Sequence, residues 1–318
     1  MQKQRTALIL GATGGIGGAI TRALVAKHWH IIALARDIQK ASARGPVGVN
    51  WVHGDVMNCA DVVKAAEGAN IIVHAVNPSG YRNWDKLVLP MIDNTIAAAR
   101  EANGARIVLP GTIYNYDPKL TPILNIDTPQ NANSRKGRIR IALEHRLKHA
   151  SEHTPVLILR AGDFFGPDVG SSWFAQAMIM PNRPVKKITN VAKGSGHSWA
   201  YLPDLAETFA RLLDIHENLQ PFEMLQFEGL YDHSGHELTD AIQRVVGVKL
   251  PIKQFPWWLM KTLSPFGGFP REAAELAPSW EYPVKLDNYR LVQLLGQEPR
   301  TPLDIAIKRT LESMKCVS

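Results

Sequence analysis

Residues 8–19 have the sequence LILGATGGIGGA, with glycines at positions 11, 14 and 17 directly after an apolar run. This order predicts a β-strand, a tight turn and the start of a helix. Glycines suit such a turn because the backbone takes positive φ, a pyrophosphate approaches without a Cβ in the way, and the helix packs closely on the sheet. Backbone N–H groups and the positive end of the helix dipole then bind phosphates. The stretch therefore predicts a dinucleotide-binding turn.

Length and composition are those of a globular protein: 318 residues, 45% hydrophobic and 20% charged. Cys59 and Cys316 are too few and too far apart for a disulfide framework or a structural zinc site, which favours a reducing compartment. The first strand begins within a few residues of Met1, and no apolar run approaches a membrane span. We therefore expect a cytoplasmic protein with no signal peptide and no membrane partner.

The net charge of +7 raises the question of nucleic-acid binding. Basic residues are scattered along the chain, with one denser group at 135–140 (RKGRIR). An excess of this size and distribution favours anionic small molecules over nucleic acid.

Apolar runs alternate with helical stretches through the first half of the chain. Strands are predicted at 6–10, 30–35, 49–53, 70–76, 105–110 and 155–160, and helices at 15–27, from about 59, and at 85–102. Such alternation at short spacing predicts an α/β protein with a doubly wound parallel sheet, the Rossmann arrangement.

The residue that follows the second predicted strand bears on the choice of cofactor. An acidic residue there accepts hydrogen bonds from the ribose 2′-OH of NAD, whereas a cation suits the 2′-phosphate of NADP. Arg36 takes that place, so NADP(H) is predicted, with Lys40 or Arg44 as helpers. The alternative is NAD(H), with Arg36 as a solvated strand-end residue. Asp55 is expected to bind the adenine amino group or to cap its own turn.

The chain resembles the extended and atypical short-chain dehydrogenase/reductase superfamily, the NAD-dependent epimerase/dehydratase-like group. The matching features are the glycines at 11, 14 and 17, GDV at 54–56, GTIYNY at 111–116, RAGDFFGP at 160–167 and WAYLPDLA at 199–206. The resemblance implies that Gly111 and Thr112 lie beside the nicotinamide, with Thr112 in the place of the catalytic serine. It also implies that the 161–167 turn, which contains Gly162, lies near the nicotinamide.

The same resemblance implies a division of labour along the chain. Residues 1–160 would form the NAD(P)-binding Rossmann domain, with a strand and helix at about 197–215 returning to it. Residues 161–318 would form mostly a smaller C-terminal α/β substrate-binding domain. In that second part, His197 is a candidate substrate contact. The apolar segment at 255–260 (FPWWLM) favours buried packing or a subunit contact over an interfacial anchor.

One departure from the family pattern concerns its Tyr-x-x-x-Lys pair, in which the lysine lowers the tyrosine pKa for proton transfer. Counting back from Glu144, Lys136 takes the tyrosine place and Arg140 the lysine place. Three interpretations are open: Lys136 is the acid or stabilises a carbonyl oxygen, Tyr114 supplies the hydroxyl, or proton transfer has been lost. The plain alternative for Lys136 and Arg140 is a solvated basic face or a phosphate clamp.

These observations predict an NADP(H)-dependent oxidoreductase that acts on a carbonyl or hydroxyl of a small organic substrate. The alternatives are a nucleotide-sugar epimerase or dehydratase and a non-catalytic NADP-sensing regulatory protein; a homodimer is a further expectation. No metal-ligand spacing is present. The predicted catalytic residues are Thr112, Tyr114 and Lys136. The predicted cofactor-binding residues are Gly11, Thr13, Gly14, Gly15, Ile16, Gly17, Arg36, Asp55, Val56, Ala75, Val76, Asn77, Gly111, Arg140 and Gly162.

Overall fold

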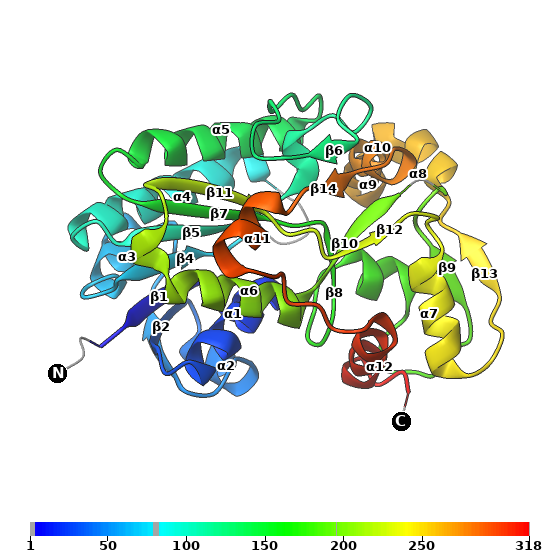
Figure 1. Cartoon of the computed structure of the whole chain (residues 1–318), viewed down its shortest axis with the longest axis horizontal. Helices are drawn as coiled ribbons and strands as arrows, with labels where there is room; N and C mark the ends of the chain where they lie inside the picture. The colour runs from blue at the N-terminus through cyan, green and yellow to red at the C-terminus, as the bar shows by residue number, and fades with distance from the viewer. Residues whose placement is uncertain (1–3, 79–82, 195, 318) are drawn as a thin grey trace. The chain divides into compact units, whose positions relative to one another are not determined.

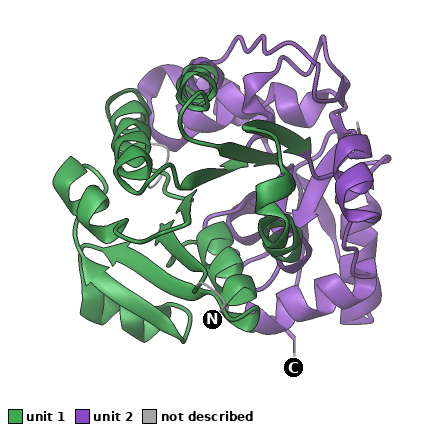
Figure 2. Cartoon of the chain, turned by 60° about the vertical axis from the view of Figure 1, so that its left-hand side comes forward, with its two compact units in different colours: residues 1–111, 139–160, 206–225 green, residues 112–138, 161–205, 226–318 purple. Residues whose placement is uncertain are grey.

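A computed structural model describes residues 4–78, 83–194 and 196–317. The chain divides into two compact units, each assembled from three stretches of sequence (Figure 2). Unit 1 comprises Met1–Gly111, Ile139–Arg160 and Ala206–Leu225, and unit 2 comprises Thr112–Arg138, Ala161–Leu205 and Gln226–Ser318.

Unit 1 is built on a seven-stranded sheet in the order β11-β7-β5-β4-β1-β2-β3. The pairings of β1 with β2 and β4, of β2 with β3, and of β5 with β4 and β7 are all parallel. The strand order reverses at β1, and at such a point open α/β sheets bind ligands. The predicted α/β fold is confirmed. The strands are β1 (Thr6–Leu10), β2 (His30–Ala35), β3 (Val49–His53), β4 (Ile71–His74), β5 (Arg106–Gly111), β7 (Val156–Arg160) and β11 (Phe222–Gln226).

Helices cover both faces of this sheet (Figure 1). Alternate strand residues such as Leu8, Ile72 and Ile107 join a buried cluster with apolar residues of α3, α4 and α5, because side chains along a strand point to opposite faces. Helices α1 and α6 lie across the other face in Figure 1. The helices are α1 (Gly15–Ala26), α2 (Ile38–Arg44), α3 (Cys59–Ala65), α4 (Trp84–Glu101), α5 (Arg135–Ala150), α6 (Leu202–Asp214) and η4 (His216–Asn218).

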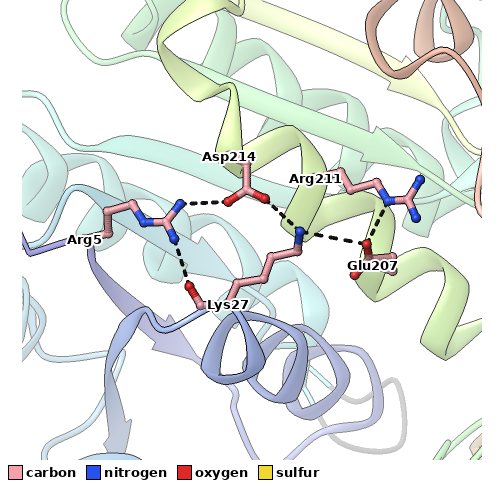
Figure 3. A network of polar contacts seen from close by, with 5 residues as sticks. All are labelled: Arg5, Lys27, Glu207, Arg211 and Asp214. Atoms are coloured by element: carbon pink, nitrogen blue, oxygen red, sulfur yellow. Dashed lines mark hydrogen bonds and ion pairs between the residues drawn. The ribbon is translucent and has the colours of Figure 1, made fainter.

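An ionic network ties the amino end of β1 and the carboxyl end of α1 to α6 (Figure 3). Arg5 donates from NH1 to Oδ1 of Asp214 at 2.7 Å, and Lys27 Nζ contacts Oδ2 of the same carboxylate at 2.7 Å. Lys27 also lies 3.9 Å from Glu207 Oε1, which accepts a hydrogen bond from Arg211 at 2.7 Å. Segments some two hundred residues apart in sequence are thereby joined within unit 1.

Unit 2 contains smaller sheets with short strands. The sheet orders are β12-β10-β8, β13-β9 and β14-β6. The strand expected near residue 197 is β10, which pairs with β8 and β12, whereas β11 is the late strand that joins the large sheet. The strands are β6 (Ile123–Leu124), β8 (Asp163–Phe165), β9 (Ile188–Asn190), β10 (His197–Tyr201), β12 (Leu230–Asp232), β13 (Ile252–Gln254) and β14 (Lys285–Leu286).

Short helices make up much of the rest of unit 2. Within the described residues, no helix of either unit is both long and apolar enough to cross a membrane. The unit 2 helices are η2 (Ile113–Asn115), η3 (Phe174–Met178), α7 (Glu237–Val246), α8 (Trp257–Leu263), η5 (Ser264–Phe266), α9 (Gly268–Leu276), α10 (Pro278–Glu281), α11 (Tyr289–Leu295) and α12 (Leu303–Ser313).

Candidate functional site

The turn after β1 has a geometry that only glycine fits. Gly11 has φ +97°, and a Cβ on it would lie 2.6 Å from the carbonyl oxygen of Ala75. A Cβ on Gly17, in the first turn of α1, would lie 2.2 Å from the carbonyl oxygen of Gly11. Both distances are far inside van der Waals contact. The ends of β1 and β4 and the start of α1 are therefore packed backbone to backbone.

The amino end of α1 is suited to an anion. Gly14 is its N-cap, and no described side chain caps the helix there. The first N–H groups of a helix lack intrahelical partners and carry the positive end of the dipole. Thr13 and Gly14 are exposed, and Gly15 and Ile16 are half-buried, so this end of the helix is accessible. These residues fit a pyrophosphate bound by main-chain groups.

The segment after β2 presents three cations and one carboxylate. Arg36 directly follows β2 and is exposed, as are Lys40 and Arg44 on α2. The neighbouring Asp37 is the N-cap of α2, where its Oδ1 accepts a hydrogen bond from Lys40 N at 2.9 Å. Asp37 keeps its negative charge, and the three cations Arg36, Lys40 and Arg44 outnumber it. The local charge after β2 is therefore positive overall.

Asp55 and Val56 form a turn after β3 that is fixed by local hydrogen bonds. Asp55 Oδ1 accepts from Met57 N at 3.0 Å, and Asp55 N donates to Asp61 Oδ2 at 2.9 Å. The carbonyl of Val56 accepts from Asn94 Nδ2 at 2.8 Å. The carboxylate of Asp55 thus performs the turn-capping role that was the alternative to adenine binding, and its contact with adenine stays a prediction.

Predicted cofactor residues also gather at the end of β4. Ala75 and Val76 are half-buried, and the exposed Asn77 accepts a hydrogen bond through Oδ1 from Arg140 NH2 at 3.3 Å. The Arg140 guanidinium lies 5.0 Å from the ring centroid of Trp84. Arg140 is therefore held at the ligand-binding edge of the sheet by an amide and an aromatic ring. It is half-buried, unlike a fully solvated surface arginine.

Just beneath this edge lies His74, the last residue of β4. The ring is buried, and its Nδ1 lies 2.8 Å from Thr95 Oγ1. Burial lowers the pKa of His74 to about 3, and the nearby charge of Arg140 acts in the same direction. His74 is consequently a neutral imidazole at physiological pH. Sequence reasoning did not single it out, although a histidine ending an apolar strand is a visible signal.

Gly111, at the carboxyl end of β5, lies against β7. Its Cβ would meet Ile158 Cγ2 at 3.0 Å and Arg160 Cα at 3.1 Å. The buried Arg160 forms a two-point ion pair with Glu144 of α5 at 3.0 and 2.8 Å. This pair fixes the registration of α5 on the sheet, so Glu144 is structural.

The three predicted catalytic residues all belong to unit 2, on two chain segments whose backbones pack against each other. Thr112 Oγ1 accepts from Tyr114 N at 3.4 Å and so caps η2. A Cβ on Gly137 would lie 2.2 Å from the carbonyl oxygen of Tyr114. The start of α5, with Lys136, therefore lies directly against the 112–114 segment. The side chains of Thr112 and Tyr114 are half-buried.

Lys136 has no exposed surface, which contradicts the alternative of a solvated basic face for this residue. Its Nζ forms ion pairs with Glu272 and with Glu275, the latter at 2.7 Å, and its backbone N donates to Glu275 Oε1 at 2.8 Å. Both glutamates lie on α9. Burial acts to raise the pKa of Glu275, but the hydrogen bonds and charge of Lys136 outweigh it and lower that pKa overall.

Sequence reasoning missed the two glutamates because they are far from Lys136 along the chain. Their only signal is the i, i+3 spacing that puts two carboxylates on one face of a helix. Once the pair is known, the chemistry of Lys136 changes: its ammonium is occupied by two carboxylates on α9.

Gly162 and its neighbours also lie in unit 2. A Cβ on Gly162 would lie 2.0 Å from the carbonyl oxygen of Ser198, so β8 and β10 meet there without room for a side chain. Next to it, Asp163 Oδ2 lies 2.9 Å from His197 Nε2, while His197 Nδ1 lies 3.2 Å from the carbonyl oxygen of Ser279. The His197 ring stacks on Trp280 with centroids 3.9 Å apart.

His197 is therefore buried with both ring nitrogens engaged. Its role as a direct substrate contact finds no support in these contacts. The 13 predicted cofactor residues from Gly11 to Gly111, together with Arg140, lie in unit 1, while Gly162 and the predicted catalytic residues lie in unit 2. Within the described stretches, no group of three or more histidine, cysteine or acidic side chains could hold a metal ion.

Comparison with known proteins identifies the nucleotide-binding region. Residues 11–153 match the model of the NAD(P)H-binding family. A 3-diazoavenalumate denitrifying reductase from a Streptomyces species is 26% identical over 178 residues. The match covers 51% of this chain and 57% of that relative, little more than half the length of each.

Solved structures of similar fold extend over nearly the whole chain. WbmH from Bordetella bronchiseptica, in complex with NAD+, has a TM-score of 0.72 at 18% identity and covers 98% of both chains. UDP-glucose 4-epimerase from Bifidobacterium longum, in complex with NAD+ and UDP, has a TM-score of 0.74 at 15% identity and covers 97% of both. The expected resemblance to the extended short-chain dehydrogenase/reductase proteins is confirmed, and at these identities the likeness establishes the fold.

Proposed function

We propose that this chain, whose fold and glycine turn are those of the short-chain dehydrogenase/reductase superfamily, is an NADP(H)-dependent oxidoreductase acting on a carbonyl or hydroxyl of a small organic substrate. The observation that carries the proposal is the anion-binding turn at Gly11 to Gly17 followed by a positive strand end at Arg36. The first fits a pyrophosphate and the second a 2′-phosphate. The similarity to a reductase supports a redox activity.

Each part of the cofactor has residues that suit it. The first N–H groups of α1 would bind the pyrophosphate, and Arg36, with Lys40 or Arg44, would bind the 2′-phosphate. Arg140, held by Asn77 and Trp84, adds positive charge at the carboxyl edge of the sheet. Bound NADP(H) supplies or accepts the hydride.

The substrate oxygen would be held by hydroxyl groups of Thr112 and Tyr114. Both lie in the segment that directly follows β5, and both are half-buried. Lys136 would fix the position of the segment that carries these hydroxyl groups. The start of α5 packs on the Tyr114 carbonyl, and Lys136 holds it to α9 through two carboxylates. A hydroxyl near the developing alkoxide stabilises its charge and donates a proton.

Cofactor binding tests the central claim. NADPH and NADH affinities are measured by titration calorimetry for the wild type, Arg36→Ala and the control Arg146→Ala, an exposed arginine that pairs with Asp93. We expect the wild type to prefer NADPH and Arg36→Ala to lose about tenfold or more in NADPH affinity, since charge-assisted phosphate contacts are worth about 1.5–3 kcal/mol. NADH affinity and the control should be unchanged. An NADPH preference that survives Arg36→Ala would refute the assignment, and absence of binding by either nucleotide would refute the function.

A second candidate is a nucleotide-sugar epimerase or dehydratase. It is favoured by the likeness in fold to UDP-glucose 4-epimerase over 97% of both chains. Such an enzyme would oxidise and reduce its cofactor within one turnover, so it would retain NAD tightly. Denaturing the purified protein and quantifying the released nucleotide discriminates the two: stoichiometric NAD favours the epimerase, and exchangeable NADP(H) favours the reductase.

A further inference from the structure

One stretch of unit 2 is cationic and apolar at once. Residues 241–271 contain Arg244, Lys249, Lys253, Lys261 and Arg271 and no aspartate or glutamate. Asp304 and Glu281, from outside the stretch, pair with Arg244 and Lys261, so Lys249, Lys253 and Arg271 carry its remaining positive charge. In a chain with 29 acidic residues among 318, such a stretch is a local departure from the mixed charge elsewhere. It spans the end of α7, β13, α8, η5 and the start of α9.

The same stretch exposes large apolar side chains. Trp258 is 70% exposed, Phe266 87% and Phe269 54%, and these three residues lie on α8, η5 and α9, which pack on one another. Gly267 and Gly268 have positive φ (+79° and +62°), so a glycine turn separates the two exposed phenylalanines. Large aromatic residues exposed this close together mark an interaction surface rather than an ordinary exterior.

The neighbouring tryptophan shows how this surface is attached to the unit. Trp257 is buried, its Nε1 donates to the carbonyl oxygen of Val191 at 2.8 Å, and its ring lies among those of Trp173, Phe255 and Trp280. Trp258 is the next residue of α8, so its side chain lies on another side of the helix and is exposed. The sequence favoured buried packing or a subunit contact for the segment at 255–260. Trp257 is buried and Trp258 is exposed, so packing within the unit accounts for the first and not for the second.

More exposed cations lie on and before two neighbouring strands of the unit. Strand β9 pairs with β13 in parallel (Figure 1), with Ile188 opposite Ile252. Lys186 and Lys187 precede β9, as Lys249 precedes β13. Lys186, Lys187, Lys249 and Lys253 are all exposed, and so is Arg271 at the start of α9. Lysine and arginine beside exposed tryptophan and phenylalanine form the pattern of a segment that lies in a membrane interface.

We propose that this surface, comprising Trp258, Phe266 and Phe269 with Lys253 and Arg271, docks unit 2 on an anionic lipid bilayer. The charge selects this occupant. Exposed Lys253 and Arg271 complement anionic headgroups, whereas a second copy of this chain would bring a surface with the same positive excess. Anionic headgroups attract each cation by about fivefold in affinity, while the aromatic rings enter the interfacial region. The attachment is peripheral and independent of the proposed enzymatic function.

Vesicle sedimentation tests the docking. The wild type is mixed with vesicles of phosphatidylcholine alone and of phosphatidylcholine with phosphatidylglycerol. We expect sedimentation with the anionic vesicles, weakened by added salt and weak or absent with the neutral ones. Lys253→Gln/Arg271→Gln should bind about 25-fold more weakly, at about fivefold per charge. Trp258→Ser/Phe266→Ser should also lose binding.

The matched control is Tyr289→Ser, because Tyr289 is 67% exposed on α11, outside the proposed surface. It should bind vesicles like the wild type, and every variant should keep the wild-type melting temperature. The proposal is overturned if the wild type stays in the supernatant with both vesicles, or if Tyr289→Ser weakens binding as much as Trp258→Ser/Phe266→Ser. It is also overturned if the wild type binds no vesicles and analytical ultracentrifugation shows a dimer that these substitutions dissociate.

Discussion

Lys136 occupies the position where the family pattern has a tyrosine. Its buried side chain instead holds the start of α5 to α9. A fully buried ammonium is tolerated only when its charge is paired, and Glu272 and Glu275 provide that pairing from α9. Removing one member of such a group leaves the other charges uncompensated in a poorly solvated place. The structural role of Lys136 is thus open to a stability measurement that needs no substrate.

Lys136→Met should lower the free energy of unfolding by about 3 kcal/mol, because two carboxylates lose their cation. Urea unfolding followed by circular dichroism measures the change. The triple variant Lys136→Met/Glu272→Gln/Glu275→Gln is the control and should recover part of the loss, since no unpaired charge remains. A single variant within about 0.5 kcal/mol of the wild type would rule out the anchoring role.

Residues that act through the backbone could be predicted from the sequence, and those that act through distant partners could not. The need for glycine at 11 and 17 follows from local geometry, and the structure has a carbonyl oxygen where each Cβ would stand. The partners of Lys136 lie 136 and 139 residues away, and the His197 contacts with Asp163 and Ser279 span 34 and 82 residues. Only the folded chain brings such residues together.

At the scale of elements, the network around Asp214 joins β1, α1 and α6 (Figure 3). Partial burial acts to raise the pKa of Asp214, but hydrogen bonds from Lys27 and Arg5 lower it below its ordinary value overall. A carboxyl with a lowered folded-state pKa stabilises the fold above its unfolded pKa. That contribution is lost as the pH falls through the folded pKa.

Asp214→Asn should therefore lower the free energy of unfolding by up to about 1 kcal/mol at neutral pH, the scale of a partly exposed ion pair. The difference from the wild type should shrink once the pH is below the folded pKa. Urea unfolding at neutral pH and at a pH below the folded pKa of Asp214 measures the difference in unfolding free energy. Glu101→Gln, at an exposed residue, is the control. A difference that persists undiminished in acid would mean that the charge of Asp214 is not its source.

Element boundaries in unit 1 were accessible from the sequence because most of its strands are apolar runs bounded by turn residues. The bounds predicted for β1, β2 and β3 are those observed, and the predicted α1 and α4 end within a residue of the observed helices. In unit 2 the strands have two to five residues and pair across long separations, as β6 does with β14. Such short strands carry too little periodicity to specify their partners.

On the scale of the whole molecule, His74 makes the stability depend on pH. Its unfolded-state pKa is about 6.5 and its folded-state pKa about 3, so between these values the unfolded chain binds a proton that the folded chain does not. The free energy of unfolding should fall with decreasing pH through this window by up to about 1.4 kcal/mol per pH unit. Above pH 6.5 this contribution is flat.

His74→Gln should remove this slope while costing some stability at neutral pH. Urea unfolding from neutral pH, where the contribution is flat, down into the window between about 6.5 and about 3 compares the two proteins. His149→Gln is the matched control, because the His149 side chain is largely exposed and should leave the slope unchanged. Equal slopes in the wild type and His74→Gln would show that the buried imidazole does not govern acid stability.

The division of the chain into units is the feature that sequence patterns reach least well. Alternating strands and helices predicted a sheet through residue 160, but not that β11 would be its edge strand beside β7. Arg106 of β5 donates hydrogen bonds to the carbonyl oxygens of His216, Leu219 and Gln220, which hold the β11 approach in place. These contacts depend on residues 110 or more positions apart.

The late return of β11 has a practical consequence for dissecting the protein. A fragment that ended at residue 160 would keep the glycine turn and Arg36 but would leave the backbone of β7 unpaired along one side. Open strand edges recruit other chains, so such a fragment would be prone to self-association however intact its nucleotide-binding residues were. A fragment designed to contain the nucleotide-binding unit alone should therefore also include residues 206–225. A truncation at residue 160 would omit the edge of its sheet.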